Sequence, residues 1–140
     1  MTDTLDAIGI RMEIHKDRFP ELNKLENQCR LMMRLAAWIA DYPDGDNYLA
    51  PFMRDGGFFQ NGYSNKEVDD ALDTELKQSD ETKRTDAFGV VQDAEAKDVP
   101  LIPLWEGKQI AAIKNTVSGV EKTFDPAFQF RFWLVTKKES

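Results

Sequence analysis

The sequence has few residues of the kinds that build covalent or metal-bound frameworks. Its 140 residues include one cysteine, Cys29, and one histidine, His15. One cysteine cannot form a disulfide within the chain, so cysteine content does not identify the cellular compartment. A single histidine cannot build a His-rich metal site, and we expect His15 to lie on the surface of a strand. We therefore expect no metal site and no bound cofactor.

Long apolar segments and an excess of basic residues are also absent. No segment stays apolar over the length that crosses a bilayer as a helix, and no export signal is visible at Met1. The net charge is -7, which argues against nucleic-acid binding, because phosphates attract a basic surface, and disfavours an anionic membrane surface. Hydrophobic residues make up 41% of the chain, as in a soluble globular domain. Either the protein is cytoplasmic or the chain begins downstream of its export signal.

The common catalytic and nucleotide-binding motifs are missing as well. Asp55-Gly56-Gly57 lacks the lysine and hydroxyl residue of a phosphate-binding loop, and no Gly-x-Ser-x-Gly turn is present. A Ser-His-Asp triad would have to use His15, which lies at the wrong end of the expected fold. Asp44-Gly45-Asp46 does not have the register of an EF-hand loop, although another kind of calcium turn stays open. We expect that the protein is not an enzyme.

The first third of the chain predicts a helix end followed by a strand–helix–strand unit. Thr4 to Ile8 resemble the end of a helix that stops at Gly9. Residues 10–15 alternate apolar and polar side chains, which is typical of a half-buried strand. A short helix over Phe19 to Gln28 and a buried strand over Leu31 to Trp38 would complete a right-handed βαβ unit. A chain that begins within a helix and enters a strand directly looks cut from a larger protein.

The middle of the chain predicts a loop and two helices. Tyr48 to Tyr63 is rich in glycine and aromatic residues, so we expect a long irregular loop whose aromatic side chains either pin it to the core or serve binding. Ser64 and Glu67 have the spacing of a capping box at a helix start, and a second helix begins at Ser79 or Asp80. The first helix has an expected buried stripe of Val68, Ala71, Leu72 and Leu76. Its expected solvated face carries Asp69, Asp70, Asp73 and Glu75.

The last third predicts strands. Short apolar strands are expected over Leu101–Trp105 and Gln109–Lys114, and large side chains alternate from Phe128 to Trp133. The expected fold class is therefore α/β. We expect residues 1–140 to form a single unit, in which the βαβ unit and the helices join C-terminal strands in a mixed sheet.

One acidic turn stands out as a candidate binding site. The buried strand ends at Trp38, and Asp41, Asp44 and Asp46 follow within a short turn. Aromatic and acidic side chains at the C-terminal end of a strand have the layout of a binding site in α/β proteins. A solvated turn is the alternative, because Asp, Pro, Gly and Asn are ordinary turn residues. These residues alone leave both interpretations open.

Several segments, in order, carry a resemblance to a known family. They are Ile8-Gly9-Ile10, Ala37 to Asn47, Asn61 to Asp69, the helix start at Asp80 to Arg84, Val99 to Leu104, Val117-Ser118-Gly119 and the aromatic terminal strand. In this order they resemble the C-terminal lobe of the oligopeptide/dipeptide class (family 5) of extracytoplasmic solute-binding proteins of ABC importers. The ending Phe130 to Trp133, with Gly107-Lys108-Gln109, most resembles lipoproteins of Gram-positive actinobacteria.

This resemblance implies a fold and a site. Members of the family have two lobes of the periplasmic-binding-protein type II fold joined by a hinge, and this chain would be the C-terminal portion of the second lobe. In peptide-binding members, an aspartate of a Trp-x-x-Asp pattern pairs with the peptide α-ammonium group. That residue would be Asp41, with Trp38 lining the cleft and Tyr42 and Asn61 as further ligand-binding candidates. Ala37 departs from the family pattern, which has glycine before the tryptophan.

The resemblance also implies partners and a location. The ligand would be a peptide or a related small solute, and the partners would be ABC permease subunits and an N-terminal lobe missing from this chain. The full-length protein would be extracytoplasmic, in the periplasm or anchored as a lipoprotein. The alternative is a stand-alone acidic domain of the cytoplasm that binds a cation or a basic partner. The coding sequence upstream of Met1 distinguishes the two, because only the receptor needs an export signal and an N-terminal domain.

Overall fold

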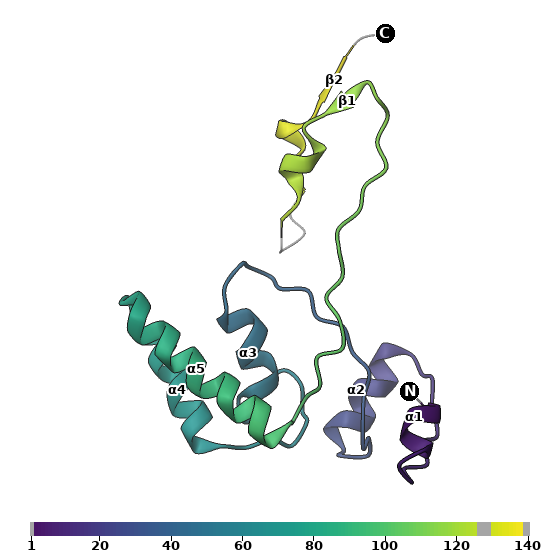
Figure 1. The fold of residues 1–140 in the computed structure, drawn as a ribbon, viewed down its shortest axis with the longest axis vertical. Helices are drawn as coiled ribbons and strands as arrows, with labels where there is room; N and C mark the ends of the chain where they lie inside the picture. The colour runs from purple at the N-terminus through teal and green to yellow at the C-terminus, as the bar shows by residue number, and fades with distance from the viewer. Residues whose placement is uncertain (1, 126–129, 139–140) are drawn as a thin grey trace. The chain divides into compact units, whose positions relative to one another are not determined.

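A computed structural model of the chain describes residues 2–125 and 130–138 (Figure 1). The chain divides into two compact units, Met1–Met33 and Arg34–Ser140. The described residues contain α-helices, short 3-10 helices and one two-stranded sheet, which is compatible with the expected α/β class. Among these residues, every helix is too short or too polar to cross a membrane.

The first unit contains two short helices. Helix α1 (Thr2–Asp6) ends shortly before Gly9, which has a φ of 82°, so the expected glycine stop is confirmed. Helix α2 (Phe19–Asn27) forms where the sequence predicts it, with proline in its first turn. No side chain between residues 2 and 33 is buried. The described part of this unit therefore has no hydrophobic core.

The expected βαβ unit does not form among the described residues, and that prediction is wrong for this structure. Residues 10–15 and 33–38 have no regular secondary structure. Their apolar side chains are exposed; Ile14, for example, is 60% exposed and Leu35 68%. An alternating pattern shows that one face of a strand can be buried, but a strand also needs a neighbour for its backbone N–H and C=O groups. Neither segment has such a neighbour in the described structure.

The second unit is built on three helices. Helices α4 (Lys66–Lys77) and α5 (Glu81–Asp98) pack side by side, and α3 (Asp46–Met53) lies against them (Figure 1). The buried core of these helices is apolar and consists of Met53, Val68, Ala71, Leu72 and Val91. Helix α3 corrects the prediction of an irregular segment from Tyr48 to Tyr63, because the start of that segment, as far as Met53, is helical. The glycines that predict the loop begin only at Gly56, after the helix has ended.

The buried stripe of α4 is only partly as predicted. The first three expected positions are buried, but Leu76 is 60% exposed, whereas Glu75 is 0% exposed. Positions 75 and 76 flank the same helical stripe, so which of them is buried depends on the neighbouring helix. Arg84 of α5 donates hydrogen bonds to the Glu75 carboxylate at 3.0 and 3.1 Å, and this contact selects Glu75.

The two long helices begin with side-chain caps. Asp80, one of the two expected start positions, caps α5. Asn65 caps α4 in place of Ser64, since Asn65 Oδ1 accepts a hydrogen bond from the Glu67 N–H at 3.0 Å. The Ser64 hydroxyl instead donates to the Asp55 carboxylate at 3.0 Å. Both residue types are good caps, so the neighbouring carboxylate decides which one takes the role.

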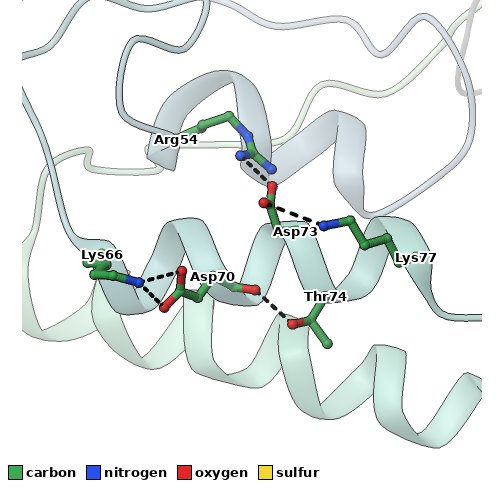
Figure 2. A network of polar contacts seen from close by, with 6 residues as sticks. All are labelled: Arg54, Lys66, Asp70, Asp73, Thr74 and Lys77. Atoms are coloured by element: carbon green, nitrogen blue, oxygen red, sulfur yellow. Dashed lines mark hydrogen bonds and ion pairs between the residues drawn. The ribbon is translucent and has the colours of Figure 1, made fainter.

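Charged side chains cover the outer face of α4 (Figure 2). Lys66 pairs with Asp70 at 2.6 Å, one turn along the helix. Arg54, directly after α3, pairs with Asp73 at 2.9 Å, and Lys77 approaches the same carboxylate at 3.7 Å. The hydrogen bond from Arg54 lowers the pKa of Asp73, with a further contribution from Lys77. The Arg54 contact links the end of α3 to α4.

The C-terminal segment contains a small antiparallel sheet. Strand β1 (Val117–Ser118) pairs with β2 (Thr136–Lys137), with Val117 opposite Lys137. Between the strands are two 3-10 helices, η1 (Val120–Thr123) and η2 (Phe132–Leu134).

The predicted C-terminal strands differ from this arrangement. Leu101–Trp105 and Gln109–Lys114 have no regular secondary structure, and their side chains are mostly exposed; Ile110, for example, is 89% exposed. Part of the predicted Phe128–Trp133 strand lies outside the described residues. Its end, from Phe132, belongs to the 3-10 helix η2. As for residues 10–15, these segments have an apolar face but no neighbouring strand in the described structure.

Candidate functional site

The acidic turn is held by Asn47, near the start of α3, which is 6% exposed. The indole N–H of Trp38 donates to the Asn47 carbonyl at 2.7 Å, and the Asp41 backbone N–H donates to Asn47 Oδ1 at 3.0 Å. Inside α3 the Asn47 carbonyl would normally accept from the N–H four residues later. That residue is Pro51, which has no N–H. The proline therefore leaves this carbonyl available to Trp38.

Trp38 is also part of an aromatic cluster. Its ring centroid lies 5.6 Å from that of Phe52, 5.4 Å from Phe58 and 5.7 Å from Phe59. Phe59 is 8% exposed and stacks on Phe52, whereas Phe58 is 63% exposed. The cluster thus pins the segment after α3, in agreement with one of the two interpretations of these aromatic residues. It also leaves an open aromatic face beside the turn.

Asp41 differs from the other two aspartates of the turn. Its backbone N–H is fixed by Asn47, but its side chain is exposed. Within the described part of the chain, no hydrogen bond or ion pair engages the Asp41 carboxylate. This carboxylate is therefore held in place by its backbone and remains available to a ligand.

Tyr42 lies on the outer side of the turn. Its hydroxyl donates to Asp46 Oδ2 at 2.7 Å, and the residue is 45% exposed. A hydrogen bond with Asn47 lowers the pKa of Tyr42, but the bond to Asp46, partial burial and the charges of Asp46 and Asp44 together raise the pKa above 10.0. Tyr42 is thus a neutral hydrogen-bonding residue near neutral pH.

Asp44 and Asp46 shape the turn, as the sequence suggests for these two residues. Asp44 Oδ1 accepts from the Asp46 backbone N–H at 2.9 Å, which closes the turn before α3. The same oxygen accepts from the Arg84 guanidinium at 2.5 Å. The hydrogen bond from Arg84, then that from Asp46, lowers the pKa of Asp44 below 3.8. Both carboxylates are committed to internal contacts.

Asn61 is also committed to local structure. Its amide nitrogen donates to the Phe52 carbonyl at 2.9 Å, and its Oδ1 accepts from the Tyr63 N–H at 3.1 Å. These bonds fasten the segment after α3 to the end of that helix. The structure therefore places Asp41 and Tyr42 in the turn and Trp38 just before it, with Asn61 bonded to the helix that follows the turn.

Sequence reasoning missed Asn47, Glu75 and Arg84 as residues that position this turn. Asn47 shows one sequence signal, the proline four residues later, which leaves a helical carbonyl open. Glu75 and Arg84 show none, because their contact joins two helices. Among the described residues, no group of three or more acidic, histidine or cysteine side chains is arranged to hold a metal ion.

Comparisons with known proteins give three curated relatives. The chain is 29% identical over 119 residues to Di/tripeptide-binding protein 2 of Pseudomonas aeruginosa, covering 82% of this chain. It is 25% identical over 125 residues to the peptide transport periplasmic protein SapA of Haemophilus influenzae, covering 85%. It is 29% identical over 112 residues to the glutathione-binding protein GsiB of Shigella dysenteriae, covering 76%. No family model and no solved structure matches the chain.

The chain spans 22% of the length of each of these relatives. All three are named as binding or transport proteins and none as an enzyme, which agrees with the expectation from the missing catalytic motifs. The resemblance indicated by the ordered motifs is therefore confirmed: over most of its length this chain is similar to solute-binding proteins of the oligopeptide and dipeptide class.

Proposed function

We propose that this chain is the C-terminal portion of the second lobe of a solute-binding protein that captures peptides, or a related small solute, for an ABC importer. In the full-length protein the ligand lies between two lobes, and closure about the hinge presents the loaded protein to the permease subunits. The full-length protein works outside the cytoplasm, in the periplasm or as a membrane-anchored lipoprotein. Similarity to three relatives named for peptides or glutathione is the observation that carries this proposal.

The geometry of the turn supports a role in recognising a peptide amino terminus. A desolvated ammonium group needs a carboxylate, and a charge-assisted hydrogen bond contributes about 1.5–3 kcal/mol. Asp41 offers an exposed carboxylate on a fixed backbone. Trp38 and the open face of Phe58 offer apolar area and a cation–π surface beside it. In this proposal Tyr42 lines the same side of the cleft, and Asn61 supports it by holding the neighbouring segment.

The unpaired apolar segments support the assignment to part of a lobe. Residues 10–15, 31–38 and 109–114 have the composition of strands, but their apolar side chains are largely exposed. A strand forms when a neighbour satisfies its backbone groups, and such neighbours would come from the remainder of the lobe. In the longer protein we expect these segments to become strands of a mixed sheet. Slow amide exchange of residues 31–38 there, and fast exchange in the isolated chain, would support this assignment.

Calorimetry on the longer protein tests the function. We expect a di- to pentapeptide or glutathione to bind, and Asp41→Ala to weaken peptide binding by about 2–4 kcal/mol, as for an enclosed charge that loses its counterion. Asp93→Asn is a matched control, because Asp93 is exposed on α5, away from the turn. If none of these peptides binds, the proposed function is contradicted. If peptide binding survives Asp41→Ala, the site that binds the amine lies elsewhere.

The isolated 140-residue chain gives a second test. It supplies only part of the contacts and no enclosure, so we expect a dissociation constant of about 1 mM or weaker for the same peptides. A micromolar dissociation constant for the isolated chain would contradict the division of the site between two lobes.

A further inference from the structure

Glu75 is a carboxylic acid buried on the apolar side of a helix. Its side chain is 0% exposed, although α4 offers an exposed position one residue later at Leu76. Its Oε2 accepts two hydrogen bonds from Arg84, at 3.0 and 3.1 Å. Its other oxygen, Oε1, is buried and accepts no hydrogen bond from any described residue. An ionised carboxylate with one oxygen unsolvated is costly to bury, so this group needs another source of stabilisation.

Asp46, at the start of α3, has a second buried carboxylate oxygen without a hydrogen-bond donor in the described part of the chain. Asp46 Oδ2 accepts from the Tyr42 hydroxyl at 2.7 Å, but Asp46 Oδ1 is buried and has no donor among the described residues. Arg84 brings the two residues together: it donates to Glu75 Oε2 at 3.0 Å and to Asp44 Oδ1, the oxygen that also accepts the Asp46 backbone N–H. A hydrogen bond with Asp46 also contributes to the raised pKa of Glu75. Two ionised carboxylates in this position would repel each other and leave both inner oxygens unsatisfied. A protonated carboxyl group has an O–H donor, so one proton would satisfy both.

We propose that Asp46 and Glu75 hold one proton between them, which makes the pair a buried proton-binding site that ties the acidic turn and the start of α3 to α4. This inference concerns the chain itself and does not depend on peptide binding. In this proposal the proton belongs to the pair and is not assigned to either residue.

The charges that surround the pair favour one proton. Arg84 of α5 is the cation that contacts it, and Arg84 is shared with the carboxylate of Asp44 from the turn. Tyr42 faces Asp46 from the turn as a neutral donor. With Asp44, Asp46 and Glu75 all ionised, three negative charges would face one guanidinium in a partly buried site. One proton on the pair leaves two carboxylates for Arg84, each bonded to it or to a neighbouring donor.

The pair makes the contact between the acidic turn and α4 depend on pH. Burial first, and then Asp46, raises the pKa of Glu75 above its ordinary value of 4.5. A raised folded-state pKa means that the stabilisation is fully present below 4.5 and is lost as the pH rises through the folded-state value. Above that value the two carboxylates repel, and the contact between the turn and α4 weakens.

A carboxyl titration by carbon-detected NMR on the full 140-residue chain tests the proposal without any variant. We expect the side-chain carboxyl signals of Asp46 and Glu75 to shift together, with an upper midpoint above 4.5, the ordinary value for Glu75. Ordinary, independent titration of the two groups would overturn the proposal. A Glu75 midpoint at or below 4.5 would also overturn it, since Arg84 alone would then account for the burial of Glu75.

Glu75→Gln supplies a second readout, in which the amide can donate to Asp46 and accept from Arg84 at every pH. We expect the urea midpoint of the wild-type chain to fall as the pH rises through the titration of the pair, and that of Glu75→Gln not to fall over the same range. Glu67→Gln is the matched control, because it makes the same change at an exposed position of α4 and should follow the wild type. A Glu75→Gln profile that keeps the wild-type fall would overturn the proposal.

Discussion

Replacing Asn47 by alanine should release the acidic turn while the helical core stays folded. The side chain of Asn47 is nearly fully buried and accepts the Asp41 backbone N–H at 3.0 Å. Its carbonyl, which holds Trp38 at 2.7 Å, belongs to the backbone and survives the substitution. Asn47→Ala therefore removes the anchor of Asp41 but not the anchor of Trp38. No residue of the apolar cluster of α3, α4 and α5 is changed.

The magnitude follows from the hydrogen bond that is lost. A hydrogen bond of this kind contributes about 0.5–1.5 kcal/mol, and a donor left without a partner costs about 1–3 kcal/mol where water cannot replace it. Because Asp41 is exposed, water can reach its N–H, so we expect a loss of about 1–2 kcal/mol. That change corresponds to an amide of Asp41 that exchanges about 5–30 times faster.

Native-state hydrogen exchange measures this release directly. We expect the Asp41 amide to lose protection in Asn47→Ala, whereas the amides of the α4 core around Leu72 change little. Asn115→Ala is the control, because Asn115 is exposed and far along the chain from the turn, and substitutions there are expected to stay within about 0.5 kcal/mol. Unchanged protection of the Asp41 amide in Asn47→Ala would refute the idea that Asn47 fixes this turn.

Three further predictions concern the helices and the charges around the turn. Leu72→Ala, at a fully buried position, should lower the free energy of unfolding by about 2–5 kcal/mol in urea titrations. Asn65→Ala should cost about 0.5–2 kcal/mol as the loss of the α4 cap, and Ser64→Ala should cost clearly less by the same measurement. The pKa of Asp44 is lowered by Arg84, so its stabilisation is present above 3.8 and is lost as the pH falls through the folded-state value. Acid unfolding of Asp44→Asn, followed by circular dichroism, should therefore show a smaller loss of stability below this pH than the wild type.

Helices were the predictable part of this fold because their signals are local. Capping residues, glycine stops and the 3.6-residue apolar period all lie within one element, and α2, α4 and α5 form close to the expected positions. Errors within the helices came from contacts between elements. Asp55 takes the Ser64 hydroxyl away from the α4 cap, and Arg84 selects Glu75 for burial in place of Leu76.

Strands were predicted less well because a strand is defined by its neighbours. The alternation in residues 10–15 and the apolar run of 31–38 indicate faces that can be buried, but no pattern within a segment supplies its hydrogen-bonding neighbour. The chain matches 22% of the length of its relatives. The two-residue strands β1 and β2 are the only pair formed among the described residues, and nothing in their short sequences predicts them.

The candidate site was partly predictable. Trp38, Asp41, Tyr42 and Asn61 were chosen from the resemblance. The structure places Asp41 and Tyr42 in the turn, anchors Trp38 to Asn47 beside it and bonds Asn61 to Phe52. Their ligand-binding roles stay predictions. Of the residues that fix the turn, Asn47 has one sequence signal, the proline four residues later, whereas Arg84 has none, because it bonds Asp44 from a different helix.

A double-mutant cycle on the longer protein tests the central claim most directly. Calorimetry would compare the wild type and Asp41→Asn, each with a dipeptide and with the same dipeptide acetylated at its amino terminus. If Asp41 pairs with the ammonium group, either change alone should weaken binding by about 2–4 kcal/mol, and both together should weaken it little more than one. Fully additive losses, or an Asp41→Asn variant that binds the free dipeptide as tightly as the wild type, would contradict the claim.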